Sequence, residues 1–253
     1  MLFMFAGDQD FDEINLMIAQ FQNTMMRARY SSIPVISAPH NMALGGGCEF
    51  SLHSDHIQAH AELYMGLVEV GVGLIPAGGG TKEMTLRFSN AVKSGDVELN
   101  RLQDAFMNIA MAKVSTSAEE ARNLGYMRKD DGITLNRKRQ LAEAKSKVIS
   151  MNESGYTQPI EQTDIRVLGK ESLALFEAGI TGMRYGAYIS EHDALIAKKL
   201  AYVMSGGDLS SPTEVSERYL LDLEREAFLS LTGEKKTLER IHSILFKGKP
   251  LRN

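Results

Sequence analysis

The sequence predicts an α/β fold in residues 1–92 and a helical C-terminal region in residues 93–253. Two observations carry this prediction. The apolar run at residues 33–38 is typical of a buried strand, and it leads through a Gly-rich turn into a segment that can form a helix. A second Gly-rich turn follows Pro76. Beyond about Ser89, most apolar residues recur at helical spacing instead.

In the first part, a helix is expected from Asp10 onward, because apolar residues recur there every three or four positions and Asp10 or Asp12 suits a helix N-terminus. These apolar residues are Phe11, Ile14, Ile18, Phe21, Met25 and Ala28. The helix is expected to pack on the strand at residues 33–38. Residues 56–59 and 62–65 are predicted as short strands, and residues 82–88 as a helix.

In the second part, Ser117 is a typical helix N-cap, with Glu120 three residues later and Gly125 where the helix would end. Residues 152–164 contain Gly155 and Pro159 and are predicted to form a loop. The other helices are expected at residues 102–114, 135–151, 170–182, 187–204, 213–231 and 234–246.

The composition is that of an ordinary globular protein. The chain has 253 residues, 43% of them apolar, and a net charge of −4, which gives no reason to expect a nucleic-acid partner. Its single cysteine, Cys48, excludes an internal disulfide and fits a reducing, cytoplasmic setting. No apolar run is long enough to span a membrane, and no Cys/His cluster has the spacing of metal ligands, so no metal is expected.

The Gly-rich turn at residues 43–50 is the first candidate site. Gly45, Gly46 and Gly47 would let a ligand approach the backbone closely, and the free N–H groups of the following helix would face it. That arrangement favours an oxygen that gains negative charge, and Glu49 in the first helical turn adds a carboxylate. The alternative reading is a plain tight turn before an ordinary helix, since a lone Gly-rich turn is a weak signal.

A second carboxylate, Glu69, lies twenty residues further on. It stands in an apolar run with Leu67, Val68 and Val70, where a charge is costly unless it is paired or used. The Gly78–Gly79–Gly80 turn that follows has Thr before Lys82, the wrong order for a phosphate-binding loop of a nucleoside triphosphatase.

Together these two stretches resemble the enoyl-CoA hydratase (crotonase) superfamily, and in particular the hydratase part of bacterial fusions with 3-hydroxyacyl-CoA dehydrogenase. The resemblance is sharpest between Pro34 and Arg87. It implies a partial crotonase-like spiral of ββα turns, an acyl-CoA substrate and no metal or redox cofactor. NAD would be bound only by an upstream dehydrogenase domain.

By this resemblance, the Gly46 N–H would stabilise the thioester oxygen while Glu49 and Glu69 act on the attacking water. Gly45 would contact the substrate. Met65, Leu67 and Val72 would line a tunnel for the acyl chain. The reaction implied is hydration of a trans-2-enoyl-CoA in fatty acid β-oxidation. Two alternatives stay open: an enoyl-CoA isomerase, which normally needs only one of the acids, and a non-catalytic acyl-CoA-binding or inter-domain packing fragment.

The start of the chain also bears on this resemblance. In the family a second oxyanion donor comes from an earlier ββα unit, for which there is no room before residue 11. The sequence is therefore expected to be the C-terminal portion of a larger protein. Strand edges left open would favour a homo-oligomer, most simply a dimer, and these residues alone would show weak activity.

Overall fold

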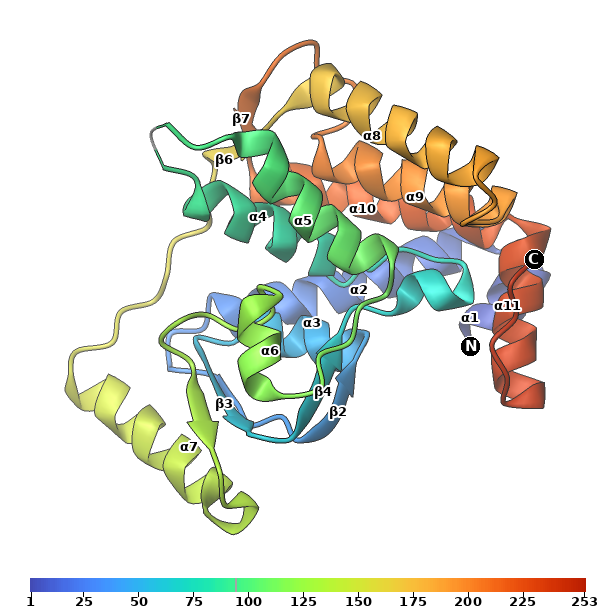
Figure 1. Cartoon of the computed structure of the whole chain (residues 1–253). Helices are drawn as coiled ribbons and strands as arrows, with labels where there is room; N and C mark the ends of the chain where they lie inside the picture. Colours follow the sequence, from blue (N-terminus) through green and yellow to red (C-terminus); the bar gives the residue numbers. More distant parts are fainter. Residues whose placement is uncertain (94) are drawn as a thin grey trace.

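The structure is a computed structural model that describes residues 1–93 and 95–253. Its N-terminal half alternates short strands and helices (Figure 1). In chain order these are α1 (Leu2–Gly7), α2 (Phe11–Arg29), β1 (Ile36–Ser37), β2 (Asn41–Leu44), α3 (Gly46–Leu52), β3 (His56–His60), β4 (Leu63–Gly66), the 3-10 helix η1 (Glu69–Val72) and α4 (Gly80–Ala91).

The second half is mainly helical, as the sequence predicts. Its elements are α5 (Glu98–Ala110), α6 (Ala118–Asn123), β5 (Gly132–Thr134), α7 (Arg137–Glu153), β6 (Ile165–Val167), α8 (Gly169–Tyr185), α9 (Glu191–Met204), β7 (Thr213–Val215), α10 (Glu217–Thr232) and α11 (Lys235–Lys247). The expected helices are all present with shifted ends, whereas β5, β6 and β7 are strands that the sequence reading missed.

The strands form two small parallel sheets, of order β1-β3-β5 and β2-β4, and an antiparallel pair of β6 with β7. In the second sheet Asn41 pairs with Leu63 and Leu44 with Gly66, so β2 and β4 end at the same edge. Parallel strands need a crossover connection, and α3 lies within it. This edge is where the first Gly-rich turn begins.

The strand predicted at residues 33–38 is the main correction to the local expectations. Only Ile36 and Ser37 are paired, and Ile33 is 67% exposed. Pro34 has no N–H to donate to a ladder, which explains why pairing begins after it. The strand that leads into the Gly-rich turn is instead β2.

Helix α2 begins where the sequence predicts. The Asp10 side chain accepts a hydrogen bond from the Glu13 N–H at 3.3 Å, a typical N-cap contact. The helix buries Ile14, Ile18 and Met25 and packs mainly against α10, α1 and α3. It therefore contacts the C-terminal helices as well as the Gly-rich turn.

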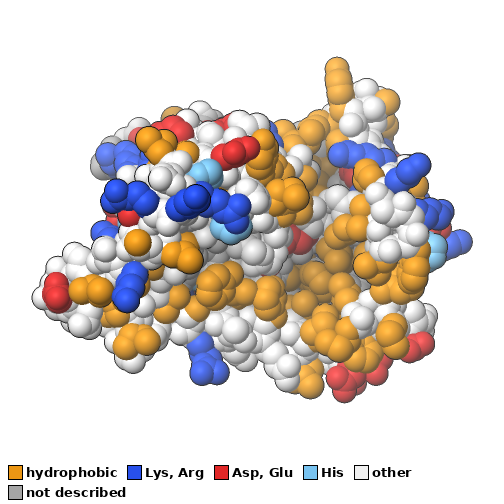
Figure 2. All heavy atoms as spheres, turned by 90° about the horizontal axis from the view of Figure 1, so that it is seen from below, with side chains coloured by type: hydrophobic (Ala, Val, Ile, Leu, Met, Phe, Trp, Pro, Cys, Tyr) orange, Lys and Arg blue, Asp and Glu red, His pale blue; other side chains and the backbone are white. Residues whose placement is uncertain are grey.

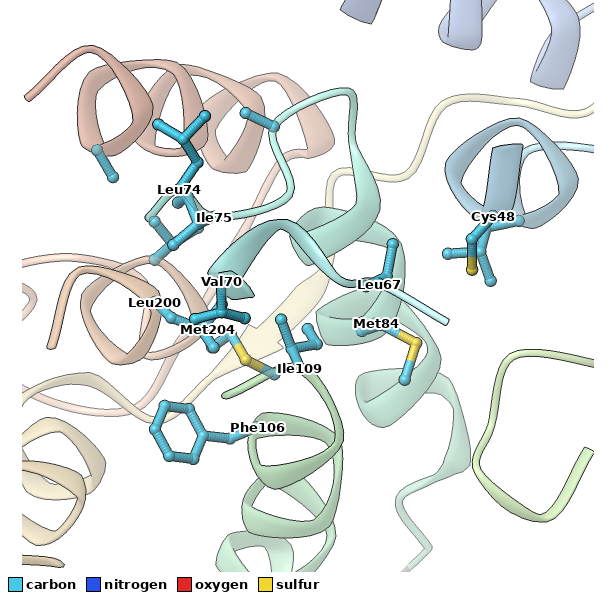
Figure 3. Packing of buried hydrophobic residues seen from close by; sticks show 14 of the residues in the cluster. Cys48, Leu67, Val70, Leu74, Ile75, Met84, Phe106, Ile109, Leu200 and Met204 are labelled. Carbon is cyan, nitrogen blue, oxygen red and sulfur yellow. The ribbon is translucent and has the colours of Figure 1, made fainter. Parts of the chain in front are cut away.

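One hydrophobic cluster joins the two halves of the chain. Figure 3 shows Leu67, Val70 and Met84 of the first half close to Phe106, Ile109 and Met204 of the second. Helix α9 packs against α8, α10, α5 and α4. The boundary between residues 92 and 93 stays a prediction, but the two segments share a core.

The two termini lie near each other, because α1 packs against α11 (Figure 1). The ring centroids of Phe3 and His242 are 5.9 Å apart, as are those of Phe3 and Phe246. Among the helices that the structure describes, none has both the length and the hydropathy required to cross a bilayer.

Candidate active site

The site begins at the turn between β2 and α3. Gly45 has φ 55 and ψ −124, a backbone conformation that residues with a side chain rarely adopt. Its N–H donates a hydrogen bond to the Gly66 carbonyl at 2.9 Å. Helix α3 then starts at Gly46 and carries Glu49 in its first turn. The strand–glycine turn–helix arrangement expected from the sequence is present.

Glu49 is held by the second Gly-rich turn. The side chain is only 2% exposed, and its Oε1 accepts hydrogen bonds from the N–H groups of Gly78 at 2.8 Å and Gly80 at 2.9 Å. A Cβ at Gly78 would come within 2.7 Å of Glu49 Oε2, and one at Gly80 within 2.8 Å of Oε1. The Gly78–Gly80 turn, in which the sequence showed only a Gly-rich helix start, thus orients the first predicted acid.

Glu69 reaches the same turn from the other side. A Cβ built on Gly45 would lie 3.1 Å from Glu69 Oε1, so the carboxyl group lies directly against that glycine. The other oxygen, Oε2, is buried and has no hydrogen-bond partner among the described residues. A buried carboxyl oxygen without a partner is costly, and it is suited to accept or donate a proton when a ligand binds.

The structure therefore brings Gly45, Gly46, Glu49 and Glu69 together. Burial raises the pKa of Glu49 from its ordinary value of 4.5 to about 7, while the Gly80 and Gly78 N–H groups oppose that rise. Burial, and then the charge of Glu49, raise the pKa of Glu69 to about 8. Two acids that titrate near neutrality can exchange protons with a substrate, one as acid and the other as base.

Two neighbours complete the site. The Phe21 ring of α2 lies over both turns: its Cζ would be 3.2 Å from a Cβ at Gly46, and its Cε1 would be 2.2 Å from one at Gly78. Sequence reasoning placed Phe21 only in the apolar stripe of the helix. Cys48 is fully buried, and burial together with the nearby carboxylates raises its pKa well above the ordinary value, which suits a packed thiol and not a nucleophile.

The residues predicted to line an acyl tunnel lie in and beside the core. Met65 and Leu67 are fully buried, Val72 is partly exposed, and their role in a tunnel stays a prediction. A small apolar cavity of about 40 Å³ opens beside Val70, immediately after Glu69. Its other walls come from α5, α8, α9 and the α8–α9 loop, and include Phe106, Ala110, Ile180, Ile189 and Ala197.

No group of three or more His, Cys, Asp or Glu in the described part of the chain is arranged to hold a metal ion.

Comparison with known proteins agrees with this geometry. Residues 6–94, which contain both Gly-rich turns and both glutamates, match the family model described as enoyl-CoA hydratase/isomerase. Residues 6–94 are therefore similar to the enoyl-CoA hydratase/isomerase family. A Bacillus subtilis protein named "Probable 3-hydroxyacyl-CoA dehydrogenase" is 47% identical over all 253 residues, which span 32% of its length. The chain thus covers about a third of this relative, as expected from the resemblance to a fusion protein.

Two solved structures show the fold. An enoyl-CoA hydratase from Rhodobacter sphaeroides superposes with a TM-score of 0.63 over 99% of this chain and 72% of that one, at 14% identity. An enoyl-CoA hydratase from Bacillus halodurans superposes with a TM-score of 0.58 over 96% of this chain and 73% of that one, at 16% identity. The predicted fold class, a partial crotonase-like α/β spiral followed by a helical region, is confirmed.

Proposed function

We propose that this chain provides the catalytic glutamates and one oxyanion donor of an enoyl-CoA hydratase. The reaction would convert a trans-2-enoyl-CoA to a 3-hydroxyacyl-CoA in fatty acid β-oxidation, within a larger bifunctional protein. The observation that carries the proposal is the pair of glutamates Glu49 and Glu69 beside the Gly45–Gly46 turn. Glu49 is buried, Glu69 has a buried carboxyl oxygen, and both have near-neutral pKa values.

In the proposed reaction a water molecule adds across the α,β double bond. One glutamate accepts a proton from the water as its oxygen bonds to the β-carbon, and the other glutamate supplies a proton to the α-carbon. The thioester oxygen carries the negative charge that develops in between, and the Gly46 N–H stabilises it at the start of α3. Each proton lost is matched by one gained, so neither a metal nor a redox cofactor is needed.

The two acids are supported in different ways, which suits different roles. Glu49 Oε1 already accepts two backbone hydrogen bonds, which fix its direction and favour its carboxylate form. Glu69 carries the more strongly raised pKa and has a free, buried oxygen. We therefore assign the proton acceptor to Glu49 and the proton donor to Glu69.

The B. subtilis relative suggests the next step. Its printed name describes a 3-hydroxyacyl-CoA dehydrogenase, and the proposed product of this site is the substrate class of such an enzyme. An upstream dehydrogenase domain that binds NAD would therefore consume the product. In this proposal the only other ligand is coenzyme A, as part of the substrate.

The decisive experiment measures hydration of crotonyl-CoA beside a binding titration with a saturated acyl-CoA. Glu49→Gln and Glu69→Gln should each lower kcat by about 10²–10⁴-fold, because each removes one partner of general acid–base catalysis. Binding of the saturated acyl-CoA should change little. Glu62→Gln, at an exposed position near the start of β4, is the matched control.

The outcomes separate the alternatives. Near wild-type turnover in either glutamine variant would remove that glutamate from the mechanism. Double-bond migration without hydration would indicate an isomerase. Acyl-CoA binding without either reaction, measured in the longest form of the protein, would indicate a non-catalytic binding or packing fragment.

A further inference from the structure

A further glutamate, Glu224, lies close to the turn that holds Glu49. It belongs to α10 in the helical C-terminal region, and its side chain is fully buried. Its Oε2 accepts a hydrogen bond from the Gly79 N–H at 3.0 Å, and its Oε1 accepts one from the Lys82 N–H. Glu224 therefore caps the N-terminus of α4 from a distance of more than 140 residues along the chain.

The backbone donors of the Gly78–Gly80 turn alternate between two carboxylates. The N–H groups of Gly78 and Gly80 point to Glu49, whereas the intervening Gly79 N–H points to Glu224. The turn is thus held from both sides, by α3 through Glu49 and by α10 through Glu224. Displacing it on the α10 side would move both donors that orient Glu49.

The side chain of Lys82 does not replace these contacts. Its Nζ lies 2.6 Å from Glu83 Oε1 and 2.7 Å from Glu217 Oε2, so the ammonium group is engaged by two other carboxylates. The hydrogen bonds that the structure describes for the Glu224 carboxyl group are the two from the α4 backbone. Burial, and then the charge of Glu49, raise the pKa of Glu224 well above its ordinary value. A fully buried carboxyl group that accepts two backbone hydrogen bonds still anchors the turn, because neither donor has another partner among the described residues.

The geometry points to Glu224 as a positioning residue that fixes Glu49 through the Gly78–Gly80 turn. This inference rests on the proposed function, since it gives Glu224 a role in catalysis only through the glutamate that handles the water. It also gives the helical region a part in the chemistry, because α10 holds the turn from outside the segment that matches the family model.

The first test follows the backbone directly and needs no catalytic activity. The chain labelled with 15N-glycine has 22 glycines, and amide hydrogen exchange is measured for Gly78, Gly79 and Gly80 in the wild type and in Glu224→Gln. Glutamine presents one acceptor and one donor, so one of the two α4 N–H groups loses its partner. We expect the amide exchange rate to rise at least ~10-fold at all three glycines. This corresponds to a decrease of about 1.4 kcal/mol in the free energy of local opening. Glu226→Gln, exposed two residues further along α10, should leave all three unchanged.

A change confined to Gly79 would overturn the inference, because Glu224 would then be a helix cap and nothing more. If Glu224→Gln does not fold, amide exchange in the wild-type chain still tests the inference. A shared clamp predicts that Gly78, Gly79 and Gly80 open together, with opening free energies equal within error. Faster, independent opening of Gly79 would contradict it.

The second test is kinetic and uses the preparation in which hydratase turnover is measured. Glu224→Gln should lower kcat by about 10–10²-fold with an unchanged KM, because a misplacement of about 1 Å in a catalytic group costs up to about 10²-fold. An unaltered kcat would overturn the role in catalysis. If the longest form of the wild-type protein shows no turnover, the proposed function fails, whereas amide exchange still tests the role of Glu224 in holding the turn.

Discussion

Gly46 is the residue at which the proposed oxyanion stabilisation can be tested most directly. Gly46→Pro deletes the N–H donor and should lower kcat by about 10²–10³-fold, the usual cost of losing one oxyanion donor. Gly46→Ala keeps the donor and should cost less, although its Cβ would come within 3.2 Å of the Phe21 ring. Steady-state kinetics with crotonyl-CoA distinguish the two.

Gly47→Ala is the matched control for Gly46, since a Cβ at Gly47 meets no atom within 4 Å and the residue lies in the same helical turn. Equal and mild effects of Gly46→Pro and Gly46→Ala would place the oxyanion site elsewhere.

Glu69 makes stability depend on pH. Its pKa rises from 4.5 to about 8 in the folded chain, so the folded state binds the proton more tightly than the unfolded state does. Between these two pH values the unfolded chain releases the proton first, and the free energy of unfolding therefore falls as pH rises. Below pH 4.5 both states are protonated and the penalty is absent.

Glu69→Gln removes this penalty because glutamine stays neutral. Urea denaturation should show the variant gaining stability relative to the wild type as the pH rises across that window, by up to about 1.4 kcal/mol for each pH unit. Glu62→Gln, which is exposed, should show no such trend. A difference between variant and wild type that is constant with pH would mean that Glu69 is ionised in the folded chain throughout.

The turn that opens α4 connects α2, α3 and α10, and its packing is tight enough to be measured. Gly78→Ala would place a Cβ 2.2 Å from Phe21 Cε1 and 2.7 Å from Glu49 Oε2, so the ring and the carboxylate would both have to move. Overpacking of this kind typically costs about 1–3 kcal/mol. Thermal unfolding should therefore show a lower Tm, by about 2–4 °C for each kcal/mol in a chain of this size.

Gly71→Ala in η1 serves as the reference substitution, because a Cβ there meets no atom within 4 Å. If both variants melt together, the turn is loose and does not orient Glu49 as described.

The whole chain leaves strand edges and apolar side chains uncovered. Strands β1 and β2 each lie at the edge of a sheet within the described residues, and Met42 of β2 is 72% exposed. Figure 2 shows hydrophobic side chains spread over much of the face seen from below, with lysine and arginine side chains toward its left and right sides. Exposed edges and apolar patches favour association.

We therefore expect this chain to self-associate, most simply as a dimer. Sedimentation equilibrium over a range of concentrations measures this self-association. Met42→Lys should shift the equilibrium toward the monomer, since a charge blocks edge pairing. Tyr188→Lys, equally exposed but next to α8, should leave it unchanged. A monomer at every concentration would contradict the prediction.

The amino-acid order alone predicted most of the helices and singled out the two acids, whose catalytic role stays a prediction. Helices form through hydrogen bonds between residues four apart, so their apolar spacing and the caps at Asp10 and Ser117 are local signals, and both caps are present. The sequence also singles out both acids, because each is unusual for its surroundings. Glu49 follows the Gly45–Gly47 turn, and Glu69 is a charged residue in an apolar run.

What surrounds these acids is decided only in the folded chain. Strands β1 to β7 are two to five residues long, too short for a periodic signal, and parallel pairing joins residues distant in sequence. The sequence predicts only a helix start at the Gly78–Gly80 turn, and it places Glu224 in a helix without indicating a role for it. Their hydrogen bonds, and the near-neutral pKa values of Glu49 and Glu69, come from burial by segments far apart in the chain, and burial is a property of the packed whole.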